Sequence, residues 1–225
     1  MKKTQQVNSK NFKECISLVD AYANVAYDSP CMAHFNDEIL TTIRANVPFD
    51  NASFLDIGCG KGYFLKYLHQ LGYENNQGIE PSESLVSEAI AGNITCGSFE
   101  ENSLMDNSFD IVFTCHTLHH LPAPRPVRAI REMLRIAKKY IVIVEINNTN
   151  IPMYFRSLIL WNQEVNAFRY NIGRVRNLLA DTGSHVIYSQ HMTSLYLSGN
   201  HSWPYITLSK MGSPPYNISI AESKR

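Results

Sequence analysis

The sequence predicts an α/β fold, built on a doubly wound, mostly parallel sheet of seven strands. Short apolar runs alternate with segments of helical periodicity from residue 53 onward. Strands that are separated by helices imply parallel pairing through right-handed crossovers. The composition, with 44% apolar and 18% charged residues, is ordinary for a globular chain with a hydrophobic core.

The first strand is expected at residues 53–57, followed by a glycine-rich turn and a helix over residues 63–71 that ends before Gly72. The inner face of that helix is predicted to carry Phe64, Leu65, Tyr67, Leu68 and Leu71. Residues 77–80 form the second strand, and Pro81-Ser82 enters a helix that closes at Gly92. Its predicted inner face is Leu85, Val86, Ala89 and Ile90.

The remaining strands are expected at residues 94–96, 109–114 and 140–146. A Pro-rich turn, LPAPRP, begins a helix that runs through Ala137, and residues 140–146 are almost continuously β-branched, as in a buried strand. A helix over residues 170–182 stops at Gly183, and two closing strands follow at 185–190 and 216–221.

We expect one domain over residues 1–225, in which residues 1–50 form a helical cap over one end of the sheet. Residues 51–146 form the core, and residues 147–225 add aromatic-rich inserts, the last helix and the closing strands. The candidate substrate-lining residues in these parts, which could equally be core contacts, are Tyr22, Tyr27, Met153, Tyr154, Phe155, Trp161, Phe168 and Trp203.

Charge and hydropathy exclude several classes of partner. Twenty Lys and Arg balance twenty Asp and Glu without a basic stripe, which disfavours nucleic acid. The apolar runs are strand-sized and the polar start lacks a signal core, so we expect a cytoplasmic protein that does not engage a membrane. Five cysteines without CxxC spacing suit reduced thiols. We expect a small-molecule substrate and a monomer or homodimer.

The chemistry-bearing stretch is FLDIGCGKGYF, residues 54–64. Asp56 ends a strand, and Gly58, Gly60 and Gly62 form the turn that opens the next helix, where glycine lets a ligand approach the backbone. A tight turn with nothing bound is the alternative. Glu80 favours a nucleoside, because it ends the next strand twenty residues beyond Gly60, where a carboxylate can accept both ribose hydroxyls.

Charge distinguishes between two nucleoside cofactors. The pyrophosphate of NAD would be repelled by Asp56, whereas S-adenosylmethionine brings an ammonium and a sulfonium. The third glycine also arrives one residue early for GxGxxG, the dinucleotide pattern. Both observations favour the cationic cofactor.

The run LDIGCGKG, the acidic strand end and FDIVFTCHTLHHLP together resemble class I S-adenosylmethionine-dependent methyltransferases, especially the small-molecule branch. The resemblance covers residues 50–146 and implies a Rossmann-like methyltransferase fold. It also implies in-line methyl transfer to a small molecule, giving S-adenosylhomocysteine. The cofactor-binding residues that it implies are Asp56, Gly58, Cys59, Gly60, Gly62, Tyr63, Phe64, Glu80, Pro81, Ser82, Ser98, Phe99, Glu100, Cys115 and His116.

Within this resemblance, Asp56 and the glycine turn hold the methionine end and Glu80 holds the ribose, with Pro81 and Ser82 beside it. Ser98 stands where the family usually has an Asp for the adenine amine. Phe99 could still offer its backbone amide, and Glu100 or Glu101 a carboxylate.

Three histidines follow the fourth strand in CHTLHHLP, at the sheet edge where doubly wound folds bind ligands. Cys115 and His116 should face the transferable methyl group. His116, His119 and His120 are candidate general bases, although His119 and His120 could instead pack against or cap the next helix. No carboxylate or Cys completes a metal-ligand spacing, so we expect no metal.

Two further features leave alternatives open. The tetrapeptide SPPY at 213–216 occurs in amino-methyltransferases of nucleic-acid bases, but there it follows strand four, so we interpret it here as a rigid turn. The rival functions are an NAD-dependent oxidoreductase and a non-catalytic cofactor-binding partner subunit of the same fold.

Overall fold

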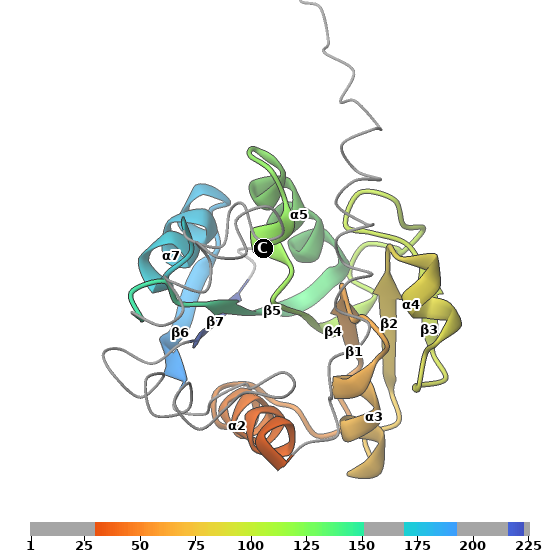
Figure 1. Cartoon of the computed structure of the whole chain (residues 1–225). Coiled ribbons are helices and arrows are strands. Elements are labelled where there is room, and N and C mark those ends of the chain that lie inside the picture. Colours follow the sequence, from red (N-terminus) through yellow and green to blue (C-terminus); the bar gives the residue numbers. More distant parts are fainter. Residues whose placement is uncertain (1–29, 151–168, 193–215, 223–225) are drawn as a thin grey trace, which may run out of the picture.

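A computed structural model describes residues 30–150, 169–192 and 216–222, and it contains a seven-stranded sheet in the order β3-β2-β1-β4-β5-β7-β6 (Figure 1). Strands β1 to β5 pair in parallel, and β7 runs antiparallel between β5 and β6. The predicted α/β class with a mostly parallel sheet is therefore confirmed. The strands are β1 (Phe54–Ile57), β2 (Asn76–Glu80), β3 (Ile94–Cys96), β4 (Phe109–Cys115), β5 (Ala137–Ile146), β6 (His185–Met192) and β7 (Tyr216–Glu222).

Helices cover both faces of this sheet. Figure 1 shows α5 and α7 on one face and α2 and α3 on the other. The helical elements are α2 (Pro30–Asn46), α3 (Tyr63–Gln70), α4 (Glu83–Ser87), the 3₁₀ turn η2 (Leu118–His120), α5 (Arg125–Ile136) and α7 (Ile172–Asp181). Within the described residues, no helix is both long and apolar enough to cross a membrane.

The core is a layer of apolar side chains on each side of the central strands. Residues 141–144 of β5 are fully buried, as the β-branched run predicts. Helix α5 contributes Ala129, Ile130 and Met133 from one face to the same core. Each large aliphatic side chain buried in this way stabilises the fold by about 1.5 to 3 kcal/mol relative to exposure.

Three expectations about the helices were wrong. Helix α4 is five residues long, Leu85 is its buried side chain, and Ala89 and Ile90 are exposed, Ile90 at 39%. The amide of Ile90 donates to the carbonyl of Lys61, so the chain leaves the helix and joins the glycine turn. Leu71 follows α3 as its C-cap and is 52% exposed rather than on the inner face.

The junction between α5 and β5 also differs from expectation, because β5 begins at Ala137 where the helix was predicted to end. Lys138 is therefore a strand residue, and its ammonium lies 3.0 Å from Asp110 on β4. Asp110 in turn accepts hydrogen bonds from the amide and hydroxyl of Ser53, which ties the starts of the central strands together. The other boundaries shift by one or two residues, within the usual scatter.

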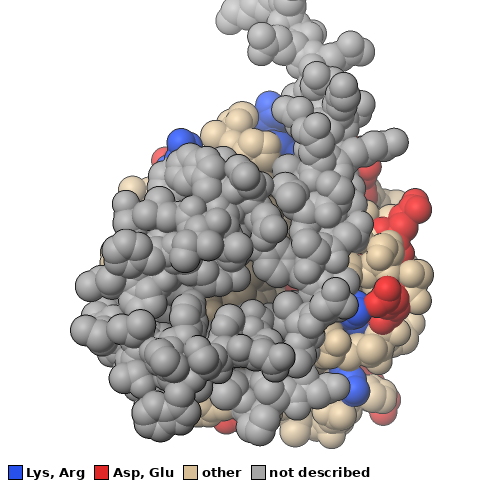
Figure 2. Space-filling model, viewed as in Figure 1, with Lys and Arg blue, Asp and Glu red and all other residues tan. Residues whose placement is uncertain are grey.

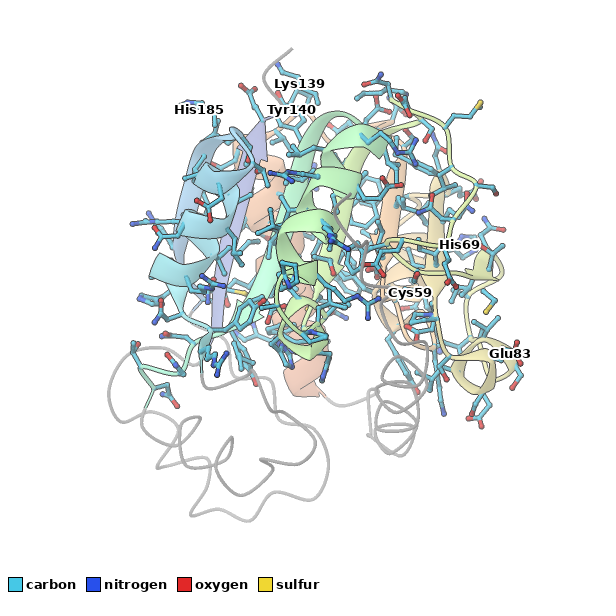
Figure 3. The ribbon with its side chains drawn as sticks, turned by 90° about the horizontal axis from the view of Figure 1, so that it is seen from above. Cys59, His69, Glu83, Lys139, Tyr140 and His185 are labelled. Atoms are coloured by element: carbon cyan, nitrogen blue, oxygen red, sulfur yellow. The ribbon has the colours of Figure 1, made fainter. Side chains whose placement is uncertain are left out.

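The topology places a ligand crevice beside β1. The chain runs from β1 to β2 and β3 on one side, then continues with β4 and β5 on the other side of β1. Doubly wound sheets bind ligands at the carboxyl ends of the strands where the order reverses in this way. Figure 3 places Cys59, which follows β1, toward the end of the sheet away from Lys139 and Tyr140.

Candidate functional site

The glycine-rich turn leaves β1 through backbone bonds to its neighbour β2. The amides of Gly58 and Cys59 both donate to the carbonyl of Ile79, at 2.8 and 3.2 Å. Gly58 and Gly62 have φ of +76° and +83°, in the left-handed region that glycine adopts without strain. A Cβ built at Gly60 would meet no atom within 4 Å, so the turn is open at this point.

Glu80, at the end of β2, ties this turn to the next helix. One carboxylate oxygen accepts the Gly60 amide at 2.9 Å, and the other accepts the Ser82 amide at 3.0 Å. The Ser82 hydroxyl accepts the Leu85 amide and caps α4. Hydrogen bonds to an ionised carboxylate are strong, so Glu80 fixes both segments at the sheet edge.

Asp56, near the end of β1, differs from Glu80 because one of its carboxylate oxygens lacks a hydrogen-bond partner. It is 3% exposed, and its Oδ1 atom is buried without a hydrogen-bond partner. Burial, and then the negative charge of Glu80, raise the pKa of this carboxyl well above its usual value. Buried polar atoms without a partner are rare in folded proteins, and this one would be satisfied by a cationic or hydrogen-bond-donating ligand.

A small pocket of about 40 Å³ opens beside the glycine turn. It is lined by Ile57, Gly58, Pro81, Ser98, Phe99, Glu100, Thr117, Leu121, Arg125 and Ala129. Most of these residues lie at or after the ends of β1, β2, β3 and β4, and Arg125 and Ala129 come from α5, so the pocket lies at the carboxyl edge of the sheet. Its walls are mainly apolar, with few polar groups, as in most small-ligand sites.

The residues after β3 form a compact turn on one side of the pocket. The Ser98 hydroxyl accepts the amides of Glu100 and Glu101, at 3.3 and 3.1 Å. Glu100 reaches the pocket but is engaged by Arg125 in a two-pronged ion pair, with Nε to Oε1 at 3.0 Å. Glu101 is exposed and does not line the pocket. Sequence reasoning missed Arg125, whose partner is 25 residues away.

His116 begins the turn after β4 with a φ of +54°, unusual for a residue with a side chain. Its ring lies 4.8 Å from the ring of Tyr216 and 5.7 Å from that of Phe35 on α2. Cys115 precedes it, and burial, followed by the charges of Asp56 and Glu145, raises the pKa of its thiol. Cys115 is the last residue of β4, the strand beside β1, and His116 directly follows it.

His119 is buried and bound to a carboxylate that sequence reasoning missed. Its Nδ1 atom lies 2.7 Å from Oε2 of Glu145, and Oε1 of the same side chain accepts the Leu118 amide at 2.7 Å. Burial raises the pKa of Glu145, but His119, together with His116 and the Leu118 amide, outweighs this effect, so that the pKa of Glu145 is lowered. The sequence feature that could have indicated this carboxylate is its position as the single charged residue in the apolar run IVIVEI.

The structure thus brings Asp56, the glycines, Glu80 and Ser98 to one edge. Phe64 differs, because its side chain is core: its ring stacks on Phe113 at 4.8 Å, so the site could use its backbone at most. Tyr63 and His120 are half-buried near their predicted places. The predicted lining residues Tyr22, Tyr27, Met153, Tyr154, Phe155, Trp161, Phe168 and Trp203 lie outside the described residues. In the described ranges, no three His, Cys, Asp or Glu gather as metal ligands.

Comparison with known proteins finds similarity to methyltransferases. Residues 55–143 match the methyltransferase domain family. A curated relative, the probable methyltransferase ltbC of Aspergillus luteorubrus, is 32% identical over 138 residues, covering 51% of this chain and 46% of the relative. The chain therefore spans about half the length of this relative.

Solved structures share the fold. A possible histamine N-methyltransferase from Thermotoga maritima superimposes with a TM-score of 0.63 at 18% identity, covering 95% of this chain and 100% of that one. The magnesium protoporphyrin IX methyltransferase of Synechocystis PCC 6803, solved with bound S-adenosylmethionine, gives 0.61 at 14% identity, with coverages of 99% and 100%. A putative methyltransferase in complex with the Haloferax volcanii Trm112 activator gives 0.66 at 16% identity, with coverages of 86% and 92%. Residues 55–143 therefore form a methyltransferase domain, and the chain has the fold of S-adenosylmethionine-dependent methyltransferases.

Proposed function

We propose that this protein binds S-adenosylmethionine at the glycine-rich turn and transfers its methyl group to a small-molecule acceptor. The observation that carries the proposal is the buried, unpartnered carboxylate oxygen of Asp56 beside an open glycine turn. A cationic amino-acid end would satisfy that oxygen and relieve its repulsion with Glu80.

The residues present fit the rest of the cofactor. Backbone amides hold Glu80 beside the glycine turn, where its carboxylate is a hydrogen-bond acceptor suited to ribose hydroxyls. Pro81 and Ser98 line the apolar pocket, which suits an adenine ring. The Phe99 amide beside them has no acceptor within the described part of the chain and could donate to a ring nitrogen.

When bound, the cofactor supplies an electrophilic methyl group on a positively charged sulfur. The protein then has to hold an acceptor in line with that group and exclude water, and positioning of this kind can supply about 7 to 11 kcal/mol. Cys115 and His116 are proposed to border the reacting centre. Where the acceptor must first lose a proton, a general base is needed, and His116, His119 and His120 are the candidates that we propose.

A small acceptor agrees with the charge and the pocket. The chain has no net charge, and in Figure 2 Lys and Arg lie among Asp and Glu on the described part of the face shown. We therefore propose a cytoplasmic enzyme that acts apart from nucleic acid and membranes, as one domain and as a monomer or homodimer. The compounds named for two structural neighbours, histamine and magnesium protoporphyrin, are small molecules.

Thermal unfolding with S-adenosylmethionine, S-adenosylhomocysteine, NAD and ATP in parallel tests the cofactor assignment. At a hundredfold excess over its dissociation constant, a specific ligand adds about 2.7 kcal/mol, which should raise the midpoint by roughly 5 to 11 °C. We expect the rise with the first two ligands, its loss in Glu80→Ala, and its retention in Glu74→Ala, an exposed control.

Other outcomes of these measurements would favour one of the two alternative functions. A rise with NAD alone would identify an oxidoreductase. Binding of S-adenosylmethionine without methylation of any member of a broad acceptor panel, while an active homologue of the same fold succeeds, would indicate a non-catalytic partner subunit.

A further inference from the structure

The turn that follows β3 forms one wall of the pocket, and its hydrogen-bond acceptors are occupied within the protein. The Ser98 hydroxyl oxygen accepts the amides of Glu100 and Glu101, at 3.3 and 3.1 Å. The carbonyls of Ser98 and Phe99 each accept the side-chain amide of Asn102, at 3.1 Å. Among the interactions of the described residues, the hydroxyl proton of Ser98 and the amide proton of Phe99 remain available, and both are donors.

The carboxylate that lines the pocket is paired with an arginine. Glu100 and Arg125 form a two-pronged ion pair, in which Arg125 Nε lies 3.0 Å from Oε1 and Nη2 bonds Oε2. The Arg125 side chain is 11% exposed, and its guanidinium can donate hydrogen bonds but cannot accept them. Thr117, the fourth polar side chain of the lining, packs on Gly58 and so belongs to the glycine-turn side. In the described structure, the wall at residues 98–100 therefore offers a ligand donors rather than an uncommitted carboxylate.

Adenine and hypoxanthine differ at the edge that such a wall would face. Adenine carries a 6-amino donor beside the acceptor N1, whereas hypoxanthine carries a 6-oxo acceptor beside an N1–H donor. A carboxylate next to a backbone amide satisfies both groups of adenine and neither group of hypoxanthine, so it selects adenine. Two donors satisfy one group of each base, either N1 of adenine or the 6-oxygen of hypoxanthine. Because specificity is a difference of affinities, two donors discriminate little between these bases.

We propose that Ser98 determines the base selectivity of the pocket, and that S-inosylhomocysteine, the 6-oxo analogue of S-adenosylhomocysteine, binds there about as tightly as S-adenosylhomocysteine itself. The inference rests on the proposed function and adds a second class of ligand, the 6-oxopurine nucleosides, to the same site. The Ser98 oxygen holds the turn together and leaves the 6-amino group of adenine without an acceptor on this wall, so little is lost when an oxygen replaces that group. As a consequence, deamination of the product would not relieve its inhibition of the enzyme.

Isothermal titration of the wild type with S-adenosylhomocysteine and S-inosylhomocysteine measures this selectivity. Hydrogen bonds that pair well with one base discriminate against another by roughly 5- to 150-fold in the dissociation constant. We expect the two dissociation constants to differ by less than about fivefold. A preference for S-adenosylhomocysteine above that limit would overturn the inference and leave the proposed function intact. If the wild type binds neither ligand, the proposed function itself fails.

Ser98→Asp tests the residue that carries the inference. One oxygen of the new carboxylate can still accept the amides of Glu100 and Glu101, as the serine hydroxyl does, while the other can accept the 6-amino group. The preference for S-adenosylhomocysteine should therefore rise by roughly 5- to 150-fold. Ser103→Asp, which adds the same charge at an exposed position just beyond the turn, should leave the ratio of the two dissociation constants unchanged. A folded Ser98→Asp variant with the wild-type ratio would contradict the role of Ser98.

Glu100→Gln provides a second test, which holds even if Ser98→Asp does not fold. Because Glu100 is committed to Arg125, its replacement should leave the ratio of the two dissociation constants unchanged, even where it weakens both ligands. Glu101→Gln, an exposed neighbour that does not line the pocket, is the matched control. A ratio that shifts toward S-inosylhomocysteine by about fivefold or more in Glu100→Gln alone would show that Glu100 binds the 6-amino group, and would refute the inference.

Discussion

Replacing Asp56 with Asn should stabilise the ligand-free protein and weaken S-adenosylmethionine binding at the same time. The carboxylate is buried, its Oδ1 atom has no partner, and Glu80 repels it, so its charge destabilises the ligand-free fold. The same charge is what would attract a cationic ligand. A residue retained only for structure would change both quantities in the same direction.

The two effects have comparable sizes. The substitution removes the buried charge and its repulsion by Glu80 but leaves a polar amide in the same place, so part of the burial cost remains. Relief of about 1 kcal/mol should raise the unfolding midpoint of the ligand-free variant by roughly 2 to 4 °C for a chain of this length. A hydrogen bond to a charged group contributes about 1.5 to 3 kcal/mol, so its loss should weaken ligand binding by about 10- to 150-fold.

The pH dependence of stability tests independently whether the charge of Asp56 destabilises the ligand-free fold. Because the folded-state pKa of Asp56 is raised above its ordinary value of 3.8, the folded state keeps its proton where the unfolded chain has lost it. The stability of the wild type therefore falls as pH rises through this window, and the difference in midpoint between the Asp56→Asn variant and the wild type should widen.

Differential scanning calorimetry over pH, with isothermal titration of S-adenosylmethionine at neutral pH, measures both terms. Asp181→Asn, an exposed carboxyl at the end of α7, is the matched control and should change neither. A lower midpoint for Asp56→Asn combined with unchanged ligand affinity would refute the reasoning.

Four other substitutions test the geometry around the site. Gly62→Ala forces a left-handed φ of +83° on alanine and places its Cβ 2.4 Å from Ile94 Cδ1, so urea titration should show a loss of stability of at least about 2 kcal/mol. Gly60→Asn lies in open space at a φ of +56°. This variant should keep its stability in the same titration but bind S-adenosylhomocysteine more weakly. Thr114→Val removes the buried bond to the Ile57 carbonyl at 2.9 Å and should cost about 1 to 3 kcal/mol by denaturant titration. Burial raises the pKa of the Asp110 carboxyl, but the hydrogen bonds from Ser53 and the charge of Lys138 outweigh it, so the pKa is lowered. The stability that this carboxylate contributes is therefore lost as pH falls through its folded-state pKa. Asp110→Asn should flatten this acid limb when stability is measured against pH by circular dichroism.

The parts of the fold that could be predicted are those encoded locally. The β-branched run of β5 and the glycine turn after β1 each carry their own signal within about ten residues. Glu80 could be placed because parallel strands end at one edge of the sheet, so its sequence spacing from the turn translates into proximity.

Pairings between distant segments could not be predicted in this way. His119 meets Glu145 across 26 residues, and Arg125 meets Glu100 across 25, through crossovers whose side-chain directions depend on packing. In the segment after α4, a local pattern predicted a helix that the structure does not form. Its helical periodicity is real, but the backbone bond from Ile90 to Lys61 competes with the helix and prevails.

Asp56 and Glu80 lie at the ends of neighbouring strands, yet they differ in how the protein satisfies them. Backbone amides hold Glu80 and thereby shape the turn, whereas Asp56 Oδ1 is left without a partner. Cys59 adds no third negative charge between them, because burial and the two carboxylates raise the pKa of its thiol. The ligand-free fold thus keeps a localised excess of negative potential at the point where the turn is open. A cationic ligand that neutralises this potential on binding relieves the destabilisation that it causes in the ligand-free protein.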